Sequence, residues 1–243
     1  MRTIRIHVAS PLAVGTELVL PVQAAEHVVR VLRLPVGAAL TLFNGDGCDY
    51  QATLLGTGKA AAVRVDGVTT AHTESPLALT LGQALARGEK MDLIVQKATE
   101  LGVARIVPLL TERSEVRLDA SRADKRLAHW QAVAVSACEQ SGRARVPQIA
   151  APMALEAWLR GPDSSCGLRL ALLPDAELTA RELRLETAAA ALVVGPEGGL
   201  GERDVAALRA AGFHGLRLGP RILRTETAGL AALAALQALH GDA

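Results

Sequence analysis

The sequence predicts an α/β protein, with a small N-terminal β-barrel followed by a larger domain built on a parallel sheet. Short strand-like runs separated by glycine-rich turns fill about the first 70 residues, a pattern typical of a small barrel. From residue 77 onward, strand-like and helical runs alternate, which favours a parallel sheet covered by helices. Residues 190–194 are all apolar, as expected of the central strand of such a sheet.

The N-terminal part is predicted to be mostly strands. Apolar and polar residues alternate along 4–8, and further strands are expected at 17–20, 38–43, 50–55 and 60–68. One helix is expected at 24–32, and Asn44-Gly45-Asp46-Gly47 is a strong turn signal. The polar segment 68–76 ends in proline and is the best domain boundary. We therefore expect domains at residues 1–70 and 74–243.

The remaining elements alternate in type. Strands are expected at 77–81, 104–109, 169–173, 190–194 and 215–218, and helices at 90–101, 121–137 and 202–211. Gly102 is the expected stop of the first of these helices. A last helix begins near Thr225 and is nearly all Ala and Leu to residue 239. A helix this apolar is expected to be buried on most of its surface.

Composition excludes several classes of protein. Half of the 243 residues are hydrophobic and 21% are charged, which indicates a globular chain. The net charge of +1 does not indicate a nucleic-acid binder. Arginine far outnumbers lysine, which suits phosphate contacts but equally fits a GC-rich genome. Three cysteines without CxxC spacing imply neither a disulfide framework nor a metal site. No segment reads as a signal peptide or membrane span, so we expect a cytoplasmic protein without a membrane partner.

Two stretches are candidates for a ligand site. In the first, residues 192–202, a buried strand runs into Gly-Pro-Glu-Gly-Gly and then a helix start. The stretch is neither a GxGxxG fingerprint nor a P-loop, and Pro196 removes a backbone donor. The loop therefore suits a ligand recognised by backbone groups rather than a polyphosphate, with a plain βα turn as the alternative.

The second stretch, residues 218–229, joins a strand to the apolar last helix. Arg221 and Arg224 can hold a phosphate or a base edge. Thr225 is the predicted N-cap of the helix. Glu226 is either an active-site acid or a carboxylate that the helix dipole favours without any function.

Three pairs of basic residues form a third candidate. Each pair alone is usually solvated surface, but together, on two domains, they would form a phosphate-tracking footprint. The pairs are Arg30 with Arg33, Arg87 with Lys90, and Arg143 with Arg145.

These stretches resemble the bacterial 16S ribosomal RNA (uracil-N3)-methyltransferases of the SPOUT superfamily. The resemblance covers nearly the whole chain and is most specific at residues 195–200 and 218–227, with further matches at 27–33, 81–91 and 138–147. It implies a PUA-like RNA-binding barrel and a C-terminal SPOUT methyltransferase domain with a trefoil knot. It also implies S-adenosylmethionine as cofactor, a homodimer, no metal, and 16S ribosomal RNA of the small ribosomal subunit as substrate, methylated at N3 of a uridine.

The resemblance also assigns residues. It implies a cofactor pocket lined by Leu173, Gly195, Glu197, Gly198, Leu218, Gly219, Leu223, Arg224 and Thr225. Uracil N3–H is a weak acid, so the reaction needs a proton acceptor or a cation that stabilises the developing anion. The hypothesis makes Arg224 that cation or a phosphate clamp. Glu226 is the candidate base and Glu197 the competing one.

Three rival functions remain. A Rossmann-type oxidoreductase would need a GxGxxG loop with an acidic residue at the next strand end, and the chain lacks this pair. A non-catalytic RNA-binding protein of ribosome assembly would keep the fold without binding the cofactor. A SPOUT methyltransferase acting on another RNA position would keep both.

Overall fold

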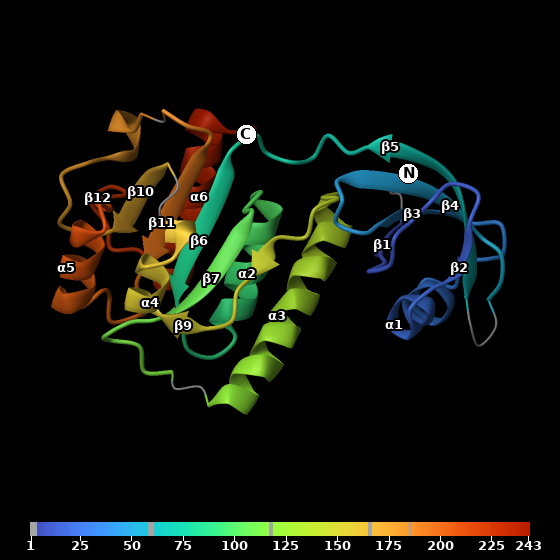
Figure 1. Ribbon diagram of the computed structural model, residues 1–243, viewed down its shortest axis with the longest axis horizontal. Helices are drawn as coiled ribbons and strands as arrows, with labels where there is room; N and C mark the ends of the chain where they lie inside the picture. The colour runs from blue at the N-terminus through green and yellow to red at the C-terminus, as the bar shows by residue number, and fades with distance from the viewer. Residues whose placement is uncertain (1–3, 58–60, 117–118, 165–166, 185) are drawn as a thin grey trace. The chain divides into compact units, whose positions relative to one another are not determined.

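The computed structural model describes residues 4–57, 61–116, 119–164, 167–184 and 186–243 (Figure 1). The chain forms two compact units. The smaller contains Met1–Glu74 and Val135–Val146, and the larger contains Ser75–Ala134 and Pro147–Ala243. Residues 135–146, expected in the C-terminal domain, therefore group with the smaller unit.

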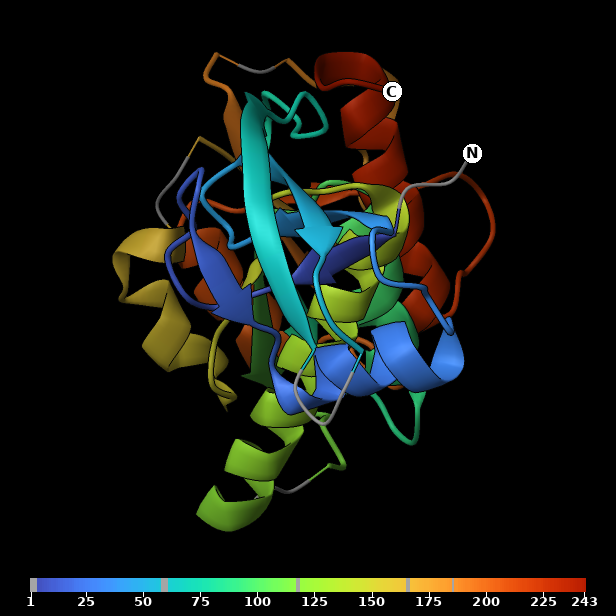
Figure 2. The ribbon, with the colours of Figure 1, turned by 90° about the vertical axis from the view of Figure 1, so that its right-hand side faces the viewer.

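The smaller unit is a curled five-stranded sheet in the order β1-β3-β4-β5-β2. β1 runs parallel to β3, and the other pairs are antiparallel. The curl of this sheet can be followed in Figure 2. Within the described residues, the two edge strands β1 and β2 do not pair with each other. The sheet therefore does not close, and it forms a half-barrel. The elements are β1 (Arg5–His7), β2 (Glu17–Val19), α1 (Val22–Glu26), the π-helix η1 (His27–Val31), β3 (Ala39–Phe43), β4 (Cys48–Leu54) and β5 (Ala62–Thr70).

Each of these elements matches an expected one, with shifts of a few residues at the ends. The expected strand 60–68 begins at a residue outside the described part of the chain and is observed as β5. Inward-facing residues such as Ile6, Leu42 and Val63 form the core, and Val28 from η1 covers it. Alternation therefore located the strands because one face of this sheet is buried.

Polar contacts and a small apolar cluster explain why residues 135–146 belong to the smaller unit. The Arg143 Nη2 atom lies 2.7 Å from Glu74 Oε2, and Arg5 donates to the Arg143 carbonyl oxygen at 3.1 Å. Cys138 and Ala144 pack with Phe43 in a small apolar cluster. These contacts join positions far apart in sequence, so local patterns do not reveal them.

The larger unit is a seven-stranded sheet in the order β12-β10-β11-β6-β7-β8, with β9 also beside β7. Every described pairing in it is parallel. β11 lies between β10 and β6 and is buried, so the predicted central strand is confirmed. The strands are β6 (Ala78–Ala84), β7 (Arg105–Leu110), β8 (Gln148–Ile149), β9 (Met153–Ala154), β10 (Leu168–Leu172), β11 (Ala189–Val194) and β12 (His214–Leu216).

Helices cover both faces of this sheet (Figure 1). On one face, Trp158 of α4 packs with Val193 and Phe213 near α5. On the other face, α6 packs on β11, β6 and α2. The helices are α2 (Lys90–Glu100), α3 (Ala120–Ser141), α4 (Leu155–Leu159), α5 (Glu202–Ala210) and α6 (Thr225–His240), with short 3-10 helices η2 (Pro162–Ser164) and η3 (Ala180–Glu182).

The last helix is less buried than its composition predicted. A stripe of α6 that includes Gly229, Leu233 and Leu236 is buried against the sheet. The opposite side is exposed at Ala234 and Ala238, and Leu239 is 49% exposed. The expectation that most of the α6 surface is buried is therefore wrong for the single chain, because only one side of the helix meets the sheet.

The segment before α6 runs against the connection between β10 and β11. Arg217 forms an isolated parallel bridge with Thr179, and its backbone N–H donates to the Leu178 carbonyl at 2.9 Å. The C-terminal segment and the connection between β10 and β11 are thus in contact, and the trefoil knot stays a prediction.

Candidate active site

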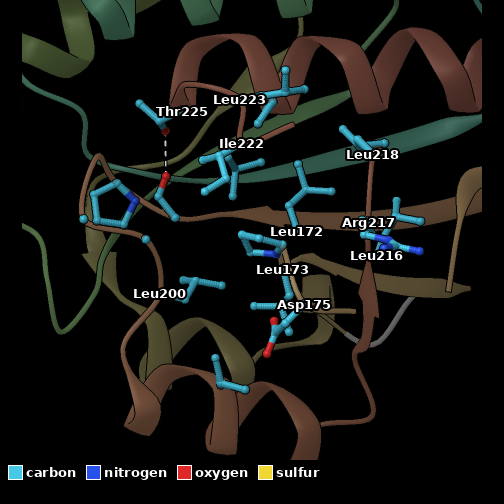
Figure 3. Close-up of a pocket in the computed structure, with 18 of the residues that line it drawn as sticks. Leu172, Leu173, Asp175, Leu200, Leu216, Arg217, Leu218, Ile222, Leu223 and Thr225 are labelled. Atoms are coloured by element: carbon cyan, nitrogen blue, oxygen red, sulfur yellow. Dashed lines mark hydrogen bonds between the residues drawn. The ribbon is translucent and has the colours of Figure 1, made fainter. Parts of the chain in front are cut away.

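A cavity of about 1100 Å³ lies in the larger unit where β10, β11 and β12 end. Its walls come from the three segments that follow these strands, at 173–175, 195–201 and 217–224, together with α5. Figure 3 shows Leu173, Leu200 and Ile222 facing this space. Ligands of open α/β sheets bind outside the carboxyl ends of the strands, so the cavity is in the expected place.

All nine predicted cofactor residues line this one cavity. Leu173 follows β10, Gly195, Glu197 and Gly198 follow β11, and the others follow β12. The two loops that the sequence singled out are therefore two walls of the same cavity. Their role in binding a cofactor stays a prediction.

Thr225 connects these two walls. Its hydroxyl donates to the Gly195 carbonyl oxygen at 2.6 Å, drawn as a dashed line in Figure 3. The same hydroxyl accepts a hydrogen bond from Gln83 Nε2 at 3.0 Å, and both side chains are buried. Arg224 is the N-cap residue of α6, and no side chain caps the helix. The predicted N-cap role of Thr225 is wrong because its hydroxyl bonds to the glycine-rich loop instead.

The glycine-rich loop is held by backbone and side-chain contacts. Asp204, buried in the first turn of α5, accepts hydrogen bonds from the backbone N–H groups of Gly201 at 2.9 Å and Glu112 at 3.2 Å. Arg113 Nη1 donates to the Gly198 carbonyl at 2.9 Å. A Cβ atom at Gly195 would lie 2.8 Å from the Leu200 nitrogen, so only glycine fits there.

Sequence reasoning missed these supporting residues. Asp204 stands three residues after Gly201 at a helix start, and this spacing is the acidic half of a capping box, so a signal was present. Nothing local marks Gln83, Glu112 or Arg113 as partners of loops that lie roughly 85–140 positions further along the chain.

Lys90 lies at the centre of a charged cluster beside the cavity. Its Nζ atom is 2.9 Å from Glu197 Oε1 and 3.4 Å from Glu226 Oε2. The Arg87 backbone N–H also donates to Glu197 Oε1 at 3.1 Å. Glu226 Oε2 is buried and accepts no hydrogen bond. Lys90 and Glu197 line the cavity, whereas Glu226, 16% exposed at its side chain, does not.

The contacts in this cluster shift the pKa values of Glu197 and Lys90. Burial alone raises the pKa of the Glu197 carboxyl, but hydrogen bonds from Lys90 and from backbone N–H groups outweigh it and hold the pKa below its ordinary value. The hydrogen bond to Glu197 raises the pKa of Lys90, with smaller contributions from the charges of Glu197 and Glu226. A base with a lowered pKa accepts protons poorly near neutral pH, so the geometry disfavours Glu197 as the base.

The predicted RNA-binding residues have different surroundings. In the smaller unit, Arg30 and Arg33 are exposed, and Arg30 pairs with Glu26. Arg143, however, is 4% exposed and pairs with Glu74. The backbone N–H of the exposed residue Arg145 donates to the same Glu74. The structure therefore argues against Arg143 as a phosphate contact and gives it a structural role.

In the larger unit, the Arg87 guanidinium pairs with Glu115. Lys90 is engaged by Glu197 and Glu226 at the cavity. Lys90 is thus part of the candidate active site rather than of a free basic surface.

The sequence led us to expect neither a metal site, nor a disulfide framework, nor a membrane span. No group of three or more potential metal ligands occurs among the described residues. Cys48 and Cys138 are free, and Cys166 lies outside the described part of the chain. Within that part, every helix is too short or too polar to span a bilayer.

Comparison with known proteins shows the family of the chain. A family model for the RNA methyltransferase domain matches residues 73–237, and a model for the RNA methyltransferase PUA domain matches residues 20–66. The chain belongs to the RNA methyltransferase family. The resemblance and the fold class predicted from the sequence, a SPOUT domain with a small N-terminal PUA-like β-barrel, are thereby confirmed, with the barrel observed as a curled half-barrel.

Relatives within this family are similar over almost the whole chain. Ribosomal RNA small subunit methyltransferase E of Buchnera aphidicola (Acyrthosiphon pisum) is 30% identical over 98% of this chain and 94% of its own length. The Bacillus subtilis protein of the same name is 32% identical over 90% of this chain and 91% of its own length.

Two solved structures of such methyltransferases have the same fold. A putative methyltransferase of Legionella pneumophila, in complex with the bound cofactor SAM, has a TM-score of 0.95 and 40% identity over 100% of both chains. Ribosomal RNA small subunit methyltransferase E of Neisseria gonorrhoeae, bound to S-adenosyl methionine, has a TM-score of 0.91 and 38% identity over 99% of both chains.

Proposed function

We propose that this protein uses S-adenosylmethionine to methylate N3 of a specific uridine in the 16S ribosomal RNA of the small ribosomal subunit. The observation that carries the proposal is the gathering of all nine predicted cofactor residues around one cavity. Membership of the RNA methyltransferase family and the cofactor bound in two similar structures support it. The choice of N3 of uridine rests on the sequence resemblance.

The cavity suits this cofactor in size and chemistry. Leu172, Leu173, Leu200 and Leu216 are among its lining residues, and they offer apolar surface to an adenine ring. Ligand cavities commonly measure roughly 300–1,000 Å³, so the 1100 Å³ cavity also leaves room for part of a substrate. S-adenosylmethionine contains no phosphate, which fits a loop where proline takes the place of a backbone donor.

When bound, the cofactor supplies an electrophilic methyl group on its sulfonium, and the accepting uracil N3 loses its proton. The protein must therefore position the base, receive that proton and stabilise negative charge at O2 or O4. We propose that Arg224 provides the stabilising charge. It lines the cavity, is exposed, and its guanidinium has no hydrogen bond or ion pair with any described residue.

Glu226 remains the proposed proton acceptor. Its buried Oε2 atom lies 3.4 Å from the Lys90 Nζ atom, a looser contact than the 2.9 Å between Lys90 and Glu197, and Glu226 lies beside the cavity rather than on its lining. Glu197 is already engaged by Lys90 and Arg87. Methyl transfer should be measured for Glu226→Gln and Glu197→Gln at saturating cofactor. We expect the larger loss of rate for Glu226→Gln, and near-full rates for both variants would rule out either residue as the base.

The rival functions within this fold are separated by one experiment. Mass spectrometry of nucleosides from small-subunit RNA should show loss of N3-methyluridine in cells that lack the gene. Persistence of N3-methyluridine, with loss of a different modified nucleoside, would identify a methyltransferase for another RNA position. No lost modification, together with no cofactor binding in calorimetry, would favour a non-catalytic protein of ribosome assembly.

We also propose that the protein acts as a homodimer in the cytoplasm. The exposed Ala and Leu side of α6, which includes Leu239, is the apolar surface that supports this. Light scattering of the purified protein should give twice the mass of the 25.3 kDa chain, and Leu239→Glu should lower it. A wild-type mass of one chain would contradict the dimer.

A further inference from the structure

The charge of the cavity exceeds what its cofactor needs. Six basic and three acidic side chains line it, an excess of three positive charges. Lys90 and Glu197 neutralise each other. The rest are five arginines and two carboxylates, namely Arg113, Arg209, Arg217, Arg221 and Arg224 with Asp175 and Glu202.

Four of these arginines have no hydrogen bond or ion pair with a described residue, although the charge of Arg217, after the hydrogen bonds with Thr179, helps to lower the pKa of Glu182. Arg113 is occupied, because it donates to the Gly198 carbonyl. The guanidinium groups of Arg209, Arg217, Arg221 and Arg224 have neither a hydrogen bond nor an ion pair within the described part of the chain, and all four residues are exposed. Some other exposed arginines of this unit pair, such as Arg122 with Asp119, and others, such as Arg203, have no partner for the guanidinium among the described residues but lie apart from the cavity lining.

A cation-binding cavity is a poor place for this charge. S-adenosylmethionine has two positive groups, the sulfonium and the ammonium, and one carboxylate. Its net charge is therefore positive, and extra arginines around it weaken its binding by repulsion. Like charges that converge without partners cost free energy, and a partner with several negative charges removes that cost.

An exposed apolar side chain lies among these arginines. Ile222 stands between Arg221 and Arg224 in sequence, lines the cavity, and is 85% exposed (Figure 3). Large apolar side chains that contact exposed bases are a recurring feature of nucleic-acid binding. Arginine and isoleucine together on one rim therefore suit a partner with phosphates and bases.

We propose that Arg209, Arg217, Arg221 and Arg224 form a phosphate-binding rim around the cavity, and that Ile222 contacts a base of the same strand. The inference rests on the proposed function and adds to it a place on the catalytic unit where the RNA backbone is held. The arginines of this rim belong to the larger unit, whereas Arg30 and Arg33 belong to the smaller one. Phosphate contacts at the rim would orient the target nucleotide, while the cavity supplies the chemistry.

The test uses the full-length protein and small ribosomal subunits purified from cells that lack the gene. Binding is measured between about 50 and 200 mM KCl, a range in which phosphate contacts strongly affect affinity. Each of Arg209→Gln, Arg217→Gln and Arg221→Gln should weaken binding. Each should also reduce the slope of log affinity against log salt by about 0.7–0.9, the value for one phosphate contact. Ile222→Ser should weaken binding without changing the slope, because an apolar contact releases no counterions.

Arg203→Gln is the matched control. Arg203 is also an exposed arginine of α5, but its side chain does not line the cavity. Rim variants with the same slope as Arg203→Gln, or as the wild type, would overturn the proposal. So would rim variants whose only defect is loss of S-adenosylmethionine binding in calorimetry, or a change of oligomeric mass. Failure of the wild type to methylate any small-subunit RNA would instead count against the proposed function.

Discussion

Replacing Thr225 by valine should loosen the connection between the two walls of the cavity. Valine keeps the shape of the side chain but removes the hydroxyl that bonds to the Gly195 carbonyl at 2.6 Å and to Gln83 Nε2 at 3.0 Å. A buried polar group left without its partner costs about 1–3 kcal/mol, and two groups lose theirs. Because Gln83 Nε2 keeps its bond to the Ala84 carbonyl, we expect a loss of about 2–4 kcal/mol in the free energy of unfolding.

The assay is urea denaturation followed by tryptophan fluorescence. Both tryptophans of the chain, Trp130 and Trp158, are 2% exposed and belong to the larger unit, so their emission reports the unfolding of that unit. Thr225→Ser is the matched control. It retains the hydroxyl and loses one methyl group, which costs about 0.8 kcal/mol. A valine variant within 0.5 kcal/mol of the serine variant, on the order of measurement error, would refute the role given to the hydroxyl.

Three other predictions concern the glycine-rich loop, the Arg143–Glu74 ion pair and the Tyr50–Asp46 hydrogen bond. Gly195→Ala should destabilise the larger unit by about 1–3 kcal/mol in the same fluorescence assay, because its Cβ would lie 2.8 Å from the Leu200 nitrogen. Gly198→Ala is the control, and it should be nearly neutral because the nearest neighbour of its Cβ is at 3.5 Å. Equal effects of the two substitutions would contradict this prediction. Arg143→Gln should cost about 1–3 kcal/mol, because the partly buried Glu74 loses the guanidinium and keeps the hydrogen bond from the Arg145 backbone N–H. Arg30→Gln at the exposed pair with Glu26 should cost less than about 0.5 kcal/mol. Thermal unfolding followed by circular dichroism distinguishes these outcomes. Absorbance at 295 nm should show the single tyrosine, Tyr50, titrating at about 12, because the hydrogen bond to Asp46, then burial, raise the pKa of its phenol. Since the folded pKa is the higher one, the stability that this contact provides is complete below the unfolded pKa of about 10 and is lost as pH rises through 12; Asp46→Asn should lower the Tyr50 pKa, and an unchanged value would refute the contact.

Sequence patterns located the elements that local physics determines. The helix expected at 90–101 is observed as α2, and Met91, Ile94, Val95 and Ala98 are buried along one side of it. Gly102, the predicted stop, has a φ of +79°, which favours glycine. The apolar run of β11 likewise gave its central place in the sheet. The two-residue strands β8 and β9 were not predicted, because they are too short to show a period.

Local sequence patterns could not predict features that depend on contacts between residues far apart in the sequence. Arg143 looked like a free basic residue, and only its approach to Glu74 makes it structural. Lys90, Glu197 and Glu226 are far apart in sequence, so no spacing rule brings them together at one side of the cavity. Thr225 had the right type for an N-cap, but its hydroxyl has a closer partner in the Gly195 carbonyl.

Calorimetric titration of the full-length protein with S-adenosylmethionine shows directly whether this cavity binds the cofactor. We expect one bound cofactor per chain for the wild type. We expect weaker binding for Gly195→Ala, in which the glycine-rich wall must shift. Absence of binding by the wild type, or undiminished binding by a folded Gly195→Ala variant, would contradict the proposed role of the cavity.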